Sequence, residues 1–148
     1  MSRLKQSKKP TITNHRLIHS DGTSHEITAA LLGFGTSERE YHNHPEPRNF
    51  DEFPETWKCS RCRWFEVSIF YIPEDDLYAV YTIGKSSLLG EEPRSKIQYT
   101  ESAFEVIEIL TDRRSPHPRL PIAAARCIAQ AASVDDDMTD AYINRAAT

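Results

Sequence analysis

Apolar and polar side chains alternate with a period of two along four segments of the chain, which is the pattern of β-strands. An Asp21-Gly22 turn between the first two segments favours a hairpin. The last two segments are joined by the turn Pro73–Asp76 and are apolar on both faces, so we expect their hairpin at the centre of a sheet. The predicted strands cover residues 11–19, 25–34, 64–72 and 77–83.

The second predicted strand has an irregular end. Ile27, Ala29 and Leu31 alternate on one face, after which Gly33 and Gly35 interrupt the apolar pattern. A long irregular segment, residues 36–58, follows it and contains Pro45, Pro47 and Pro54. Loops of this length in a compact domain are uncommon unless something ties them down or they are functional.

The spacing of apolar residues changes to that of helices after a short predicted strand at Lys96–Thr100. Ser102 and Glu105 form a capping-box pattern that opens a helix over 103–112, with Phe104, Ile107 and Leu110 on one face.

An alanine-rich second helix is predicted over about residues 121–133. Asp135 can cap a third helix, in which Met138, Ala141 and Tyr142 lie on one side. Antiparallel hairpins come first and two to three helices come last, so we expect one α+β domain over 11–148. Residues 1–10 are predicted to be a disordered basic arm.

Composition limits the possible function classes. The formal net charge of −4 over 148 residues gives no whole-protein attraction to nucleic acid. There is no long apolar run for a membrane span and no secretory signal, so we expect a cytoplasmic protein. In a reducing compartment, the Cys-x-x-Cys formed by two of the three cysteines indicates metal or redox chemistry.

These cysteines, Cys59 and Cys62, are predicted to form half of a structural Zn²⁺ site. A Cys-x-x-Cys turn holds two thiolates at a separation that suits tetrahedral zinc. His42 and His44 would project to the same side of an extended segment and complete a closed set of four ligands. If only one of them binds, a different group supplies the fourth ligand, and the candidates are His25, His19 and Asp51.

Three other roles are possible for Cys59 and Cys62, and two of them require features that can be looked for in the sequence. A thioredoxin-like pair precedes a helix, whereas Cys59 and Cys62 precede a predicted strand. Two reduced thiols without a metal are a further possibility. A metal-dependent hydrolase needs an open coordination position and a nearby acid, for which Glu40 or Glu66 could serve.

Basic and aromatic residues gather around the cysteine pair, and no acidic residue falls between 57 and 65. Such a cluster can bind a protein partner or grip phosphates and stack on bases. The alternative is that the tryptophans cover the metal knuckle while the charged ends reach water. The basic arm is likewise a solvated tail or a phosphate-seeking arm. The residues of the cluster are Trp57, Lys58, Arg61, Arg63 and Trp64.

Three stretches of the chain resemble a group of small accessory proteins carried by tailed bacteriophages of actinobacteria. They are the Cys59–Val67 stretch CSRCRWFEV, the segment from Val80 through Glu91 that opens VYTIGKSS, and the Ser102–Glu108 stretch SAFEVIE. The resemblance spans roughly residues 40–112. It implies an accessory phage protein made inside the host, where such proteins commonly bind a host or defence component; it brings no known activity.

These observations together predict a small zinc-binding interaction protein with a protein partner in the host cell. Nucleic-acid binding through the basic arm and the Trp/Arg knuckle is the alternative, and a metal-dependent hydrolase is a third.

Overall fold

The structure is a computed structural model that describes residues 10–37, 63–86, 92–111 and 120–146. The described chain is α+β, as predicted, with all strands preceding all helices. Its strands are β1 (Ile12–Ile18), β2 (Ser24–Thr36), β3 (Arg63–Ile72), β4 (Leu77–Ser86) and β5 (Arg94–Thr100). Its helices are α1 (Ala103–Leu110), α2 (Leu120–Ala132) and α3 (Asp136–Ala146).

The strands form one antiparallel sheet in the order β1-β2-β3-β4-β5. The hairpin of β3 and β4 is therefore central, which confirms the prediction made from its two apolar faces. Asp76 closes its turn in the left-handed region, with a φ of 53°.

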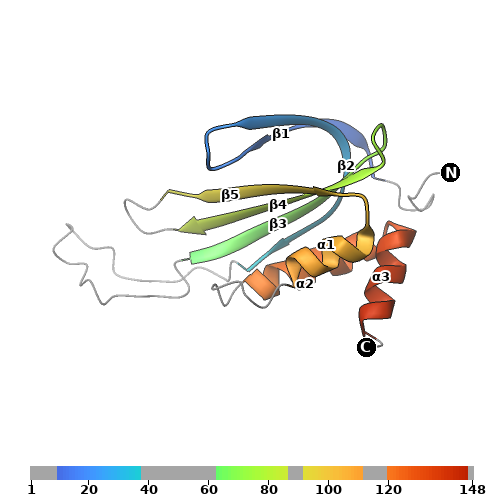
Figure 1. Cartoon of the computed structure of the whole chain (residues 1–148). Coiled ribbons are helices and arrows are strands. Elements are labelled where there is room, and N and C mark those ends of the chain that lie inside the picture. The colour runs from blue at the N-terminus through green and yellow to red at the C-terminus, as the bar shows by residue number, and fades with distance from the viewer. Residues whose placement is uncertain (1–9, 38–62, 87–91, 112–119, 147–148) are drawn as a thin grey trace.

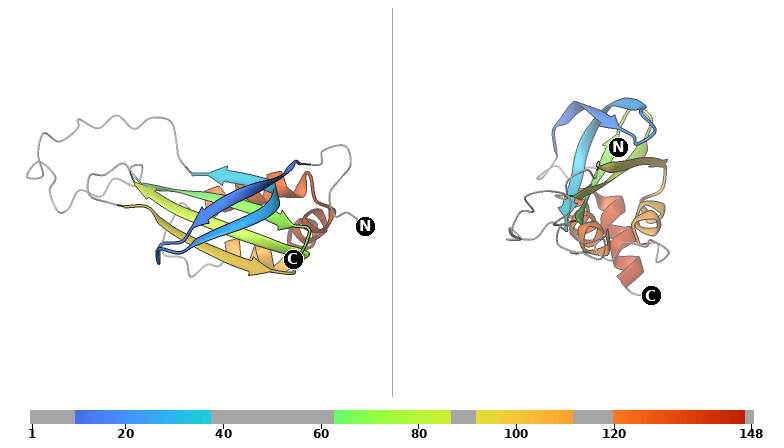
Figure 2. Two further views of the ribbon diagram at one scale, coloured as in Figure 1. Left: turned by 90° about the horizontal axis from the view of Figure 1, so that it is seen from above. Right: turned by 90° about the vertical axis from the view of Figure 1, so that its left-hand side faces the viewer.

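The sheet curls so that its two faces are covered differently (Figure 1). The three helices lie against one face, and the β1–β2 hairpin folds over the opposite face, as the two further views in Figure 2 also show. Hydrogen bonds hold the hairpin down: the Ser20 amide donates to the Ser95 carbonyl over 3.2 Å, and the Tyr81 hydroxyl donates to the Ile18 carbonyl over 2.9 Å.

This arrangement produces two apolar cores. The helix-side core joins alternate residues of β2, β3 and β4 to all three helices, and Val67, Tyr78 and Met138 are fully buried within it. The hairpin-side core is smaller and consists of Leu17, Ile27, Ala29, Phe70, Ile72 and Ala79. Phe70 and Ile72 alternate along β3 with Ile69 and Tyr71, so β3 contributes to both cores.

Strand β2 ends two residues later than the predicted end at residue 34, and it continues through Gly33 and Gly35, where the apolar pattern is interrupted. A Cβ at Gly33 would lie 2.9 Å from the Ala131 nitrogen, and one at Gly35 would lie 2.6 Å from the Cys127 nitrogen. Helix α2 therefore packs directly on the backbone of β2, and only glycine leaves room for it. The pattern breaks because of a helix more than 85 positions later in the chain.

Strand β2 has a different neighbour along each half. Its first half pairs with β1 as far as Ala30, and its second half pairs with β3 from Ala30 onwards, with a bulge between Leu31 and Gly33. Ile27 and Ala29 are buried as predicted, whereas Leu31 is 39% exposed just past the end of the pairing with β1.

Side chains of α2 cover the free edge of the second half of β2. The Phe34 amide donates to Gln130 Oε1, and Arg126 Nη1 donates to the Thr36 carbonyl, each over 2.6 Å. These bonds satisfy backbone groups that would otherwise form an exposed strand edge.

The helices begin where the sequence predicts. Ser102 caps α1 by accepting the Glu105 amide over 3.3 Å. The buried residues of α1 are Ala103, Val106, Ile107 and Leu110, while Phe104 is 48% exposed, so the predicted apolar face was one position off at its start. Met138 and Ala141 are buried in α3 as predicted, but Tyr142 is 46% exposed.

Asp135 stands directly before α3 and is completely buried. Its Oδ2 accepts the Tyr78 hydroxyl over 2.5 Å, which joins the start of α3 to the start of β4. None of the described helices has the length and apolar character needed to cross a membrane.

Candidate interaction surface

The predicted zinc ligands His42, His44, Cys59 and Cys62 lie outside the described residues, as do Trp57, Lys58 and Arg61. Arg63 and Trp64 are the members of the predicted contact cluster that the structure places. They are the first two residues of β3, next to the end of β2.

The end of β2 and the start of β3, which flank the segment 38–62, are hydrogen-bonded to each other. We call this pair of strand ends, Thr36–Ser37 with Phe65–Glu66, the neck. Thr36 pairs with Glu66, and the Ser37 amide donates to the Phe65 carbonyl over 2.9 Å. The Phe65 amide in turn donates to Ser37 Oγ over 2.8 Å, and Ser37 is 1% exposed. The segment that carries all four predicted ligands therefore leaves and re-enters the sheet at one place.

Within the part of the chain that the structure describes, one part of the sheet surface is covered neither by a helix nor by the β1–β2 hairpin. Trp64, Glu66 and Ser68 share the face of Phe70 by strand alternation, and Phe34 and Thr36 are the cross-strand partners of Ser68 and Glu66. Ile83 and Lys85 extend this surface across β4, opposite Glu66 and Trp64. We call Phe34, Thr36, Trp64, Glu66, Ile83 and Lys85 the open patch.

The open patch combines large apolar side chains with a neutralised polar centre. Phe34 is 41% exposed, and Trp64 and Ile83 are half-buried. Between them, Lys85 Nζ lies 3.0 Å from Glu66 Oε1, and the Trp64 indole N–H donates to Glu66 Oε2 over 3.3 Å. Glu66 therefore fixes the position of the indole ring and offsets the charge of Lys85.

The alternative metal ligands His19 and His25 are engaged in the β1–β2 hairpin. His19 Nδ1 accepts the Asp21 amide over 3.1 Å, and a 3.0 Å hydrogen bond joins His25 Nδ1 to the Tyr99 hydroxyl. Within the described ranges, no three His, Cys, Asp or Glu side chains are close enough to hold a metal ion.

Cys127 is the cysteine that the structure describes, and it is buried and free. Burial raises the pKa of its thiol to about 12. The burial and the raised pKa together give the physical reason for a low reactivity of this thiol.

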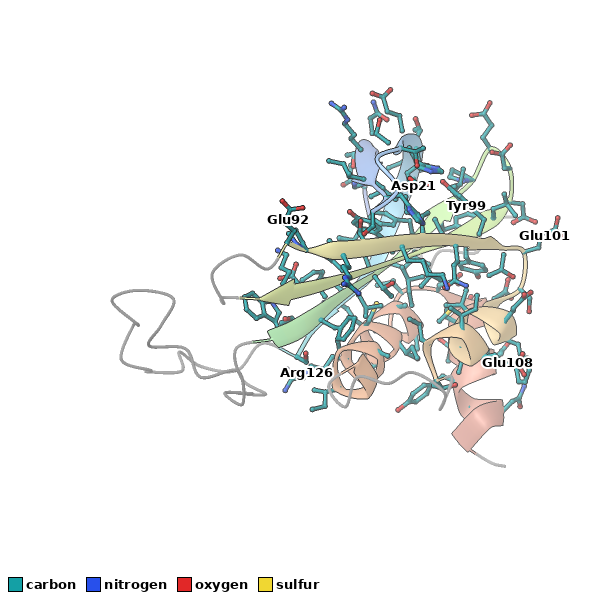
Figure 3. All side chains as sticks on the ribbon, turned by 60° about the vertical axis from the view of Figure 1, so that its left-hand side comes forward. Asp21, Glu92, Tyr99, Glu101, Glu108 and Arg126 are labelled. Atoms are coloured by element: carbon teal, nitrogen blue, oxygen red, sulfur yellow. The ribbon has the colours of Figure 1, made fainter. Side chains whose placement is uncertain are left out.

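A hollow of about 440 Å³ lies at the far side of the hairpin from the neck. Ile27, Ile72 and Leu77 are its apolar residues, and Tyr99 on β5 lines it on the side of the sheet away from the helices (Figure 3). Glu26, Glu74 and Asp75 are its acidic residues, and all three are exposed. No sequence signal predicted this hollow, because Glu74 and Asp75 are ordinary turn residues and only the fold brings Glu26 of β2 to the same hollow.

Comparison of the chain with protein-family models, curated proteins and solved structures gave no match.

Proposed function

We propose that this protein is a non-enzymatic interaction module that binds a protein partner through the open patch, with a structural zinc site in the adjoining segment. The observation that carries the proposal is a sheet surface rich in aromatic and apolar side chains at the neck of that segment. Tryptophan is enriched among the residues that dominate binding energy at protein interfaces, where apolar centres are surrounded by polar groups.

The local charges favour a protein partner over nucleic acid. Lys85 is paired with Glu66, and Glu66 also accepts the Trp64 indole N–H. Because Glu66 offsets the charge of Lys85, the surface has no net positive charge with which to attract phosphate groups. The partner would be a host or defence protein if the chain is an accessory phage protein, as the resemblance of its sequence implies.

The neck supports a zinc clip on physical grounds. His42 comes five positions after Ser37, and Cys62 comes three positions before Phe65. Five extended residues reach roughly 17 Å from Ser37 to His42, and three reach roughly 10 Å from Phe65 back to Cys62. Because Ser37 and Phe65 are hydrogen-bonded neighbours, the histidine pair and the cysteine pair can meet at one metal ion. Because the neck already closes the chain, a metal there has less loop entropy to overcome. The zinc would fasten the segment to the central hairpin and present Trp57, Lys58 and Arg61 near the open patch.

Photo-crosslinking tests the partner surface. A benzophenone amino acid replaces Phe34 in the open patch or, as a matched control, Phe104 on α1, which is similarly exposed. In an actinobacterial host we expect one discrete protein adduct from position 34, at least tenfold weaker with Trp64→Ala, and no such adduct from position 104. Identical adducts at both positions, or none, would contradict the proposal, and nuclease-sensitive adducts would favour the nucleic-acid alternative.

Metal analysis tests the clip independently. We expect one zinc per chain in the purified protein, lost in Cys59→Ser and in His42→Ala, because structural sites use a closed ligand set. His25→Ala is the control and should retain zinc, since its ring is hydrogen-bonded to Tyr99. A metal-free wild-type protein that stays folded in chelator would remove the zinc site from the proposal.

A further inference from the structure

Among the described residues, the first half of β2 has an edge without a neighbouring strand, in contrast to the second half. Ser24–Thr28 pair with β1 on one side, and among the described strands none pairs with them on the other. Backbone groups alternate in direction along a strand, so some N–H and C=O groups of Ser24–Thr28 point away from β1. Gln130 and Arg126 cover the equivalent groups at Phe34 and Thr36.

The acidic hollow lies along this uncovered edge. Glu26, Ile27 and Thr28 line it from β2, and Ile72 and the turn residues that follow it line the opposite side. The hollow therefore occupies the position that β3 would fill if β3 continued past Ile72. An extended peptide placed there would pair with β2 by strand addition and lay alternate side chains towards the apolar residues.

The charges around the hollow specify the peptide. Glu26, Glu74 and Asp75 are exposed carboxylates at its rim, so a segment with lysine or arginine is complementary. Residues 1–9 of this chain carry Arg3, Lys5, Lys8 and Lys9 and no acidic residue. Leu4 stands between two of these cations and can enter the apolar part of the hollow.

The geometry also places the start of β1 near the hollow. Ile12 pairs with Ala30, and Thr28, which lines the hollow, is two positions before Ala30 on β2. Two strand residues span about 7 Å. Nine extended residues reach roughly 30 Å, so the segment that precedes β1 is long enough to cross β2 and run along its open edge.

We propose that the basic segment 1–9 binds in this hollow as an added strand beside Ser24–Thr28. Covalent attachment keeps the segment at an effective concentration in the millimolar range, so individually weak ion pairs suffice. Binding there occupies the cations of the segment and covers the uncovered half of β2. A phosphate-seeking role for the same cations would require the segment to leave the hollow.

Zero-length crosslinking of the full-length protein tests this proposal. A carbodiimide joins an amine to a carboxylate only when the two are in contact. We expect amide links within one chain from Lys5, Lys8 or Lys9 to Glu26, Glu74 or Asp75, at least tenfold more abundant than links to Glu108 on α1. Figure 3 shows Glu108 on the helix side of the sheet, where it serves as the control carboxylate. The yield of these links should fall when the reaction is run in 0.5 M salt, because salt screens the attraction between exposed charges.

Hydrogen exchange provides a second measurement that does not depend on reactive groups. Replacing Arg3, Lys5, Lys8 and Lys9 by glutamine should accelerate exchange at Ser24–Thr28 at least fivefold and leave the central strand β3 unchanged. The matched control replaces the exposed Arg94 and Lys96 of β5 by glutamine and should not change exchange at Ser24–Thr28. Links spread evenly over the surface carboxylates, links only between two chains, or unchanged exchange would each overturn the proposal.

Discussion

Gly35 of β2 and Ala123 of α2 are in direct backbone contact, since a Cβ at Gly35 would overlap the carbonyl oxygen of Ala123. The Cys127 nitrogen is on the same side, 2.6 Å from that Cβ position. The contact holds the alanine-rich face of α2 against the sheet, and through Arg126 and Gln130 it sets the end of β2 at the neck of the 38–62 segment. The open patch includes Phe34 and Thr36 of β2, so its position depends on this close packing, which leaves no room for a side chain at Gly33 or Gly35.

Replacing Gly35 by alanine should destabilise the fold strongly. The added methyl group meets helix backbone atoms, which cannot rotate away, so we expect a loss of about 3 kcal/mol or more in the free energy of unfolding. Urea unfolding followed by circular dichroism measures it, and Gly33→Ala should behave similarly.

Gly22→Ala is the comparison for this prediction. Gly22 has a φ of 93° and nothing within 4 Å of the added Cβ, so only backbone strain of about 1 kcal/mol is expected. Equal losses at positions 22 and 35 would show that the close approach of α2 is not what requires glycine.

Removing the side chains that cover the edge of β2 should promote self-association. In Arg126→Ala/Gln130→Ala, the Phe34 amide and the Thr36 carbonyl lose these two hydrogen bonds, and this edge of β2 becomes more accessible to another chain. We expect about 1 kcal/mol lost per hydrogen bond and a concentration-dependent dimer in sedimentation velocity. Glu108→Ala on α1 should remain like the wild type; a monomeric double variant with wild-type stability would contradict the role given to these two residues.

The hydrogen bond from Tyr78 to Asp135 should be worth more than a similar bond nearer the surface. Tyr78→Phe removes a donor from a carboxylate that is completely buried, so we expect a loss of about 2 kcal/mol. Tyr71→Phe removes a 2.7 Å bond to the exposed Asp76, where water can replace the donor, and should cost under about 1 kcal/mol. Thermal unfolding of the two variants side by side tests the order, and the reverse order would refute it.

Cys127 should resist alkylation in the folded protein. With its thiol pKa at about 12, the reactive thiolate is a fraction of about 10⁻⁴ at pH 8. We expect iodoacetamide to label Cys127 only after denaturation, as measured by mass spectrometry of each cysteine peptide. Rapid labelling of the native protein would mean that the α2–sheet contact opens readily.

The same thiol gives stability a pH dependence. Its pKa is raised from 9.0 in the reference state to about 12 in the fold, so the folded state retains a proton that the unfolded state releases. Its contribution is complete below about pH 9 and is lost as the pH rises towards 12. Cys127→Ala should show a shallower fall in stability between pH 9 and pH 11.

Sequence pattern alone determined the element types and their order. Strand alternation, the Asp21-Gly22 turn and the Ser102 cap are local signals, and each predicted strand and helix is present within a few residues of its expected bounds. The central place of the β3–β4 hairpin also followed from local information, since both of its faces are apolar. The predicted zinc ligands are equally a local inference, and they remain a prediction because they lie outside the described residues.

Only the tertiary structure decided what each surface faces. Gly33 and Gly35 interrupt the apolar pattern for no local reason, but α2 packs against them from more than 85 positions away. Phe104 faces outward and Leu31 is partly exposed because burial depends on which element lies opposite. The open patch and the acidic hollow likewise arise where the curl of the sheet leaves one surface uncovered and brings Glu26 near Glu74. The periodicity of the sequence specifies which side chains share one face of a strand or helix. The element that packs against that face comes from a distant part of the chain.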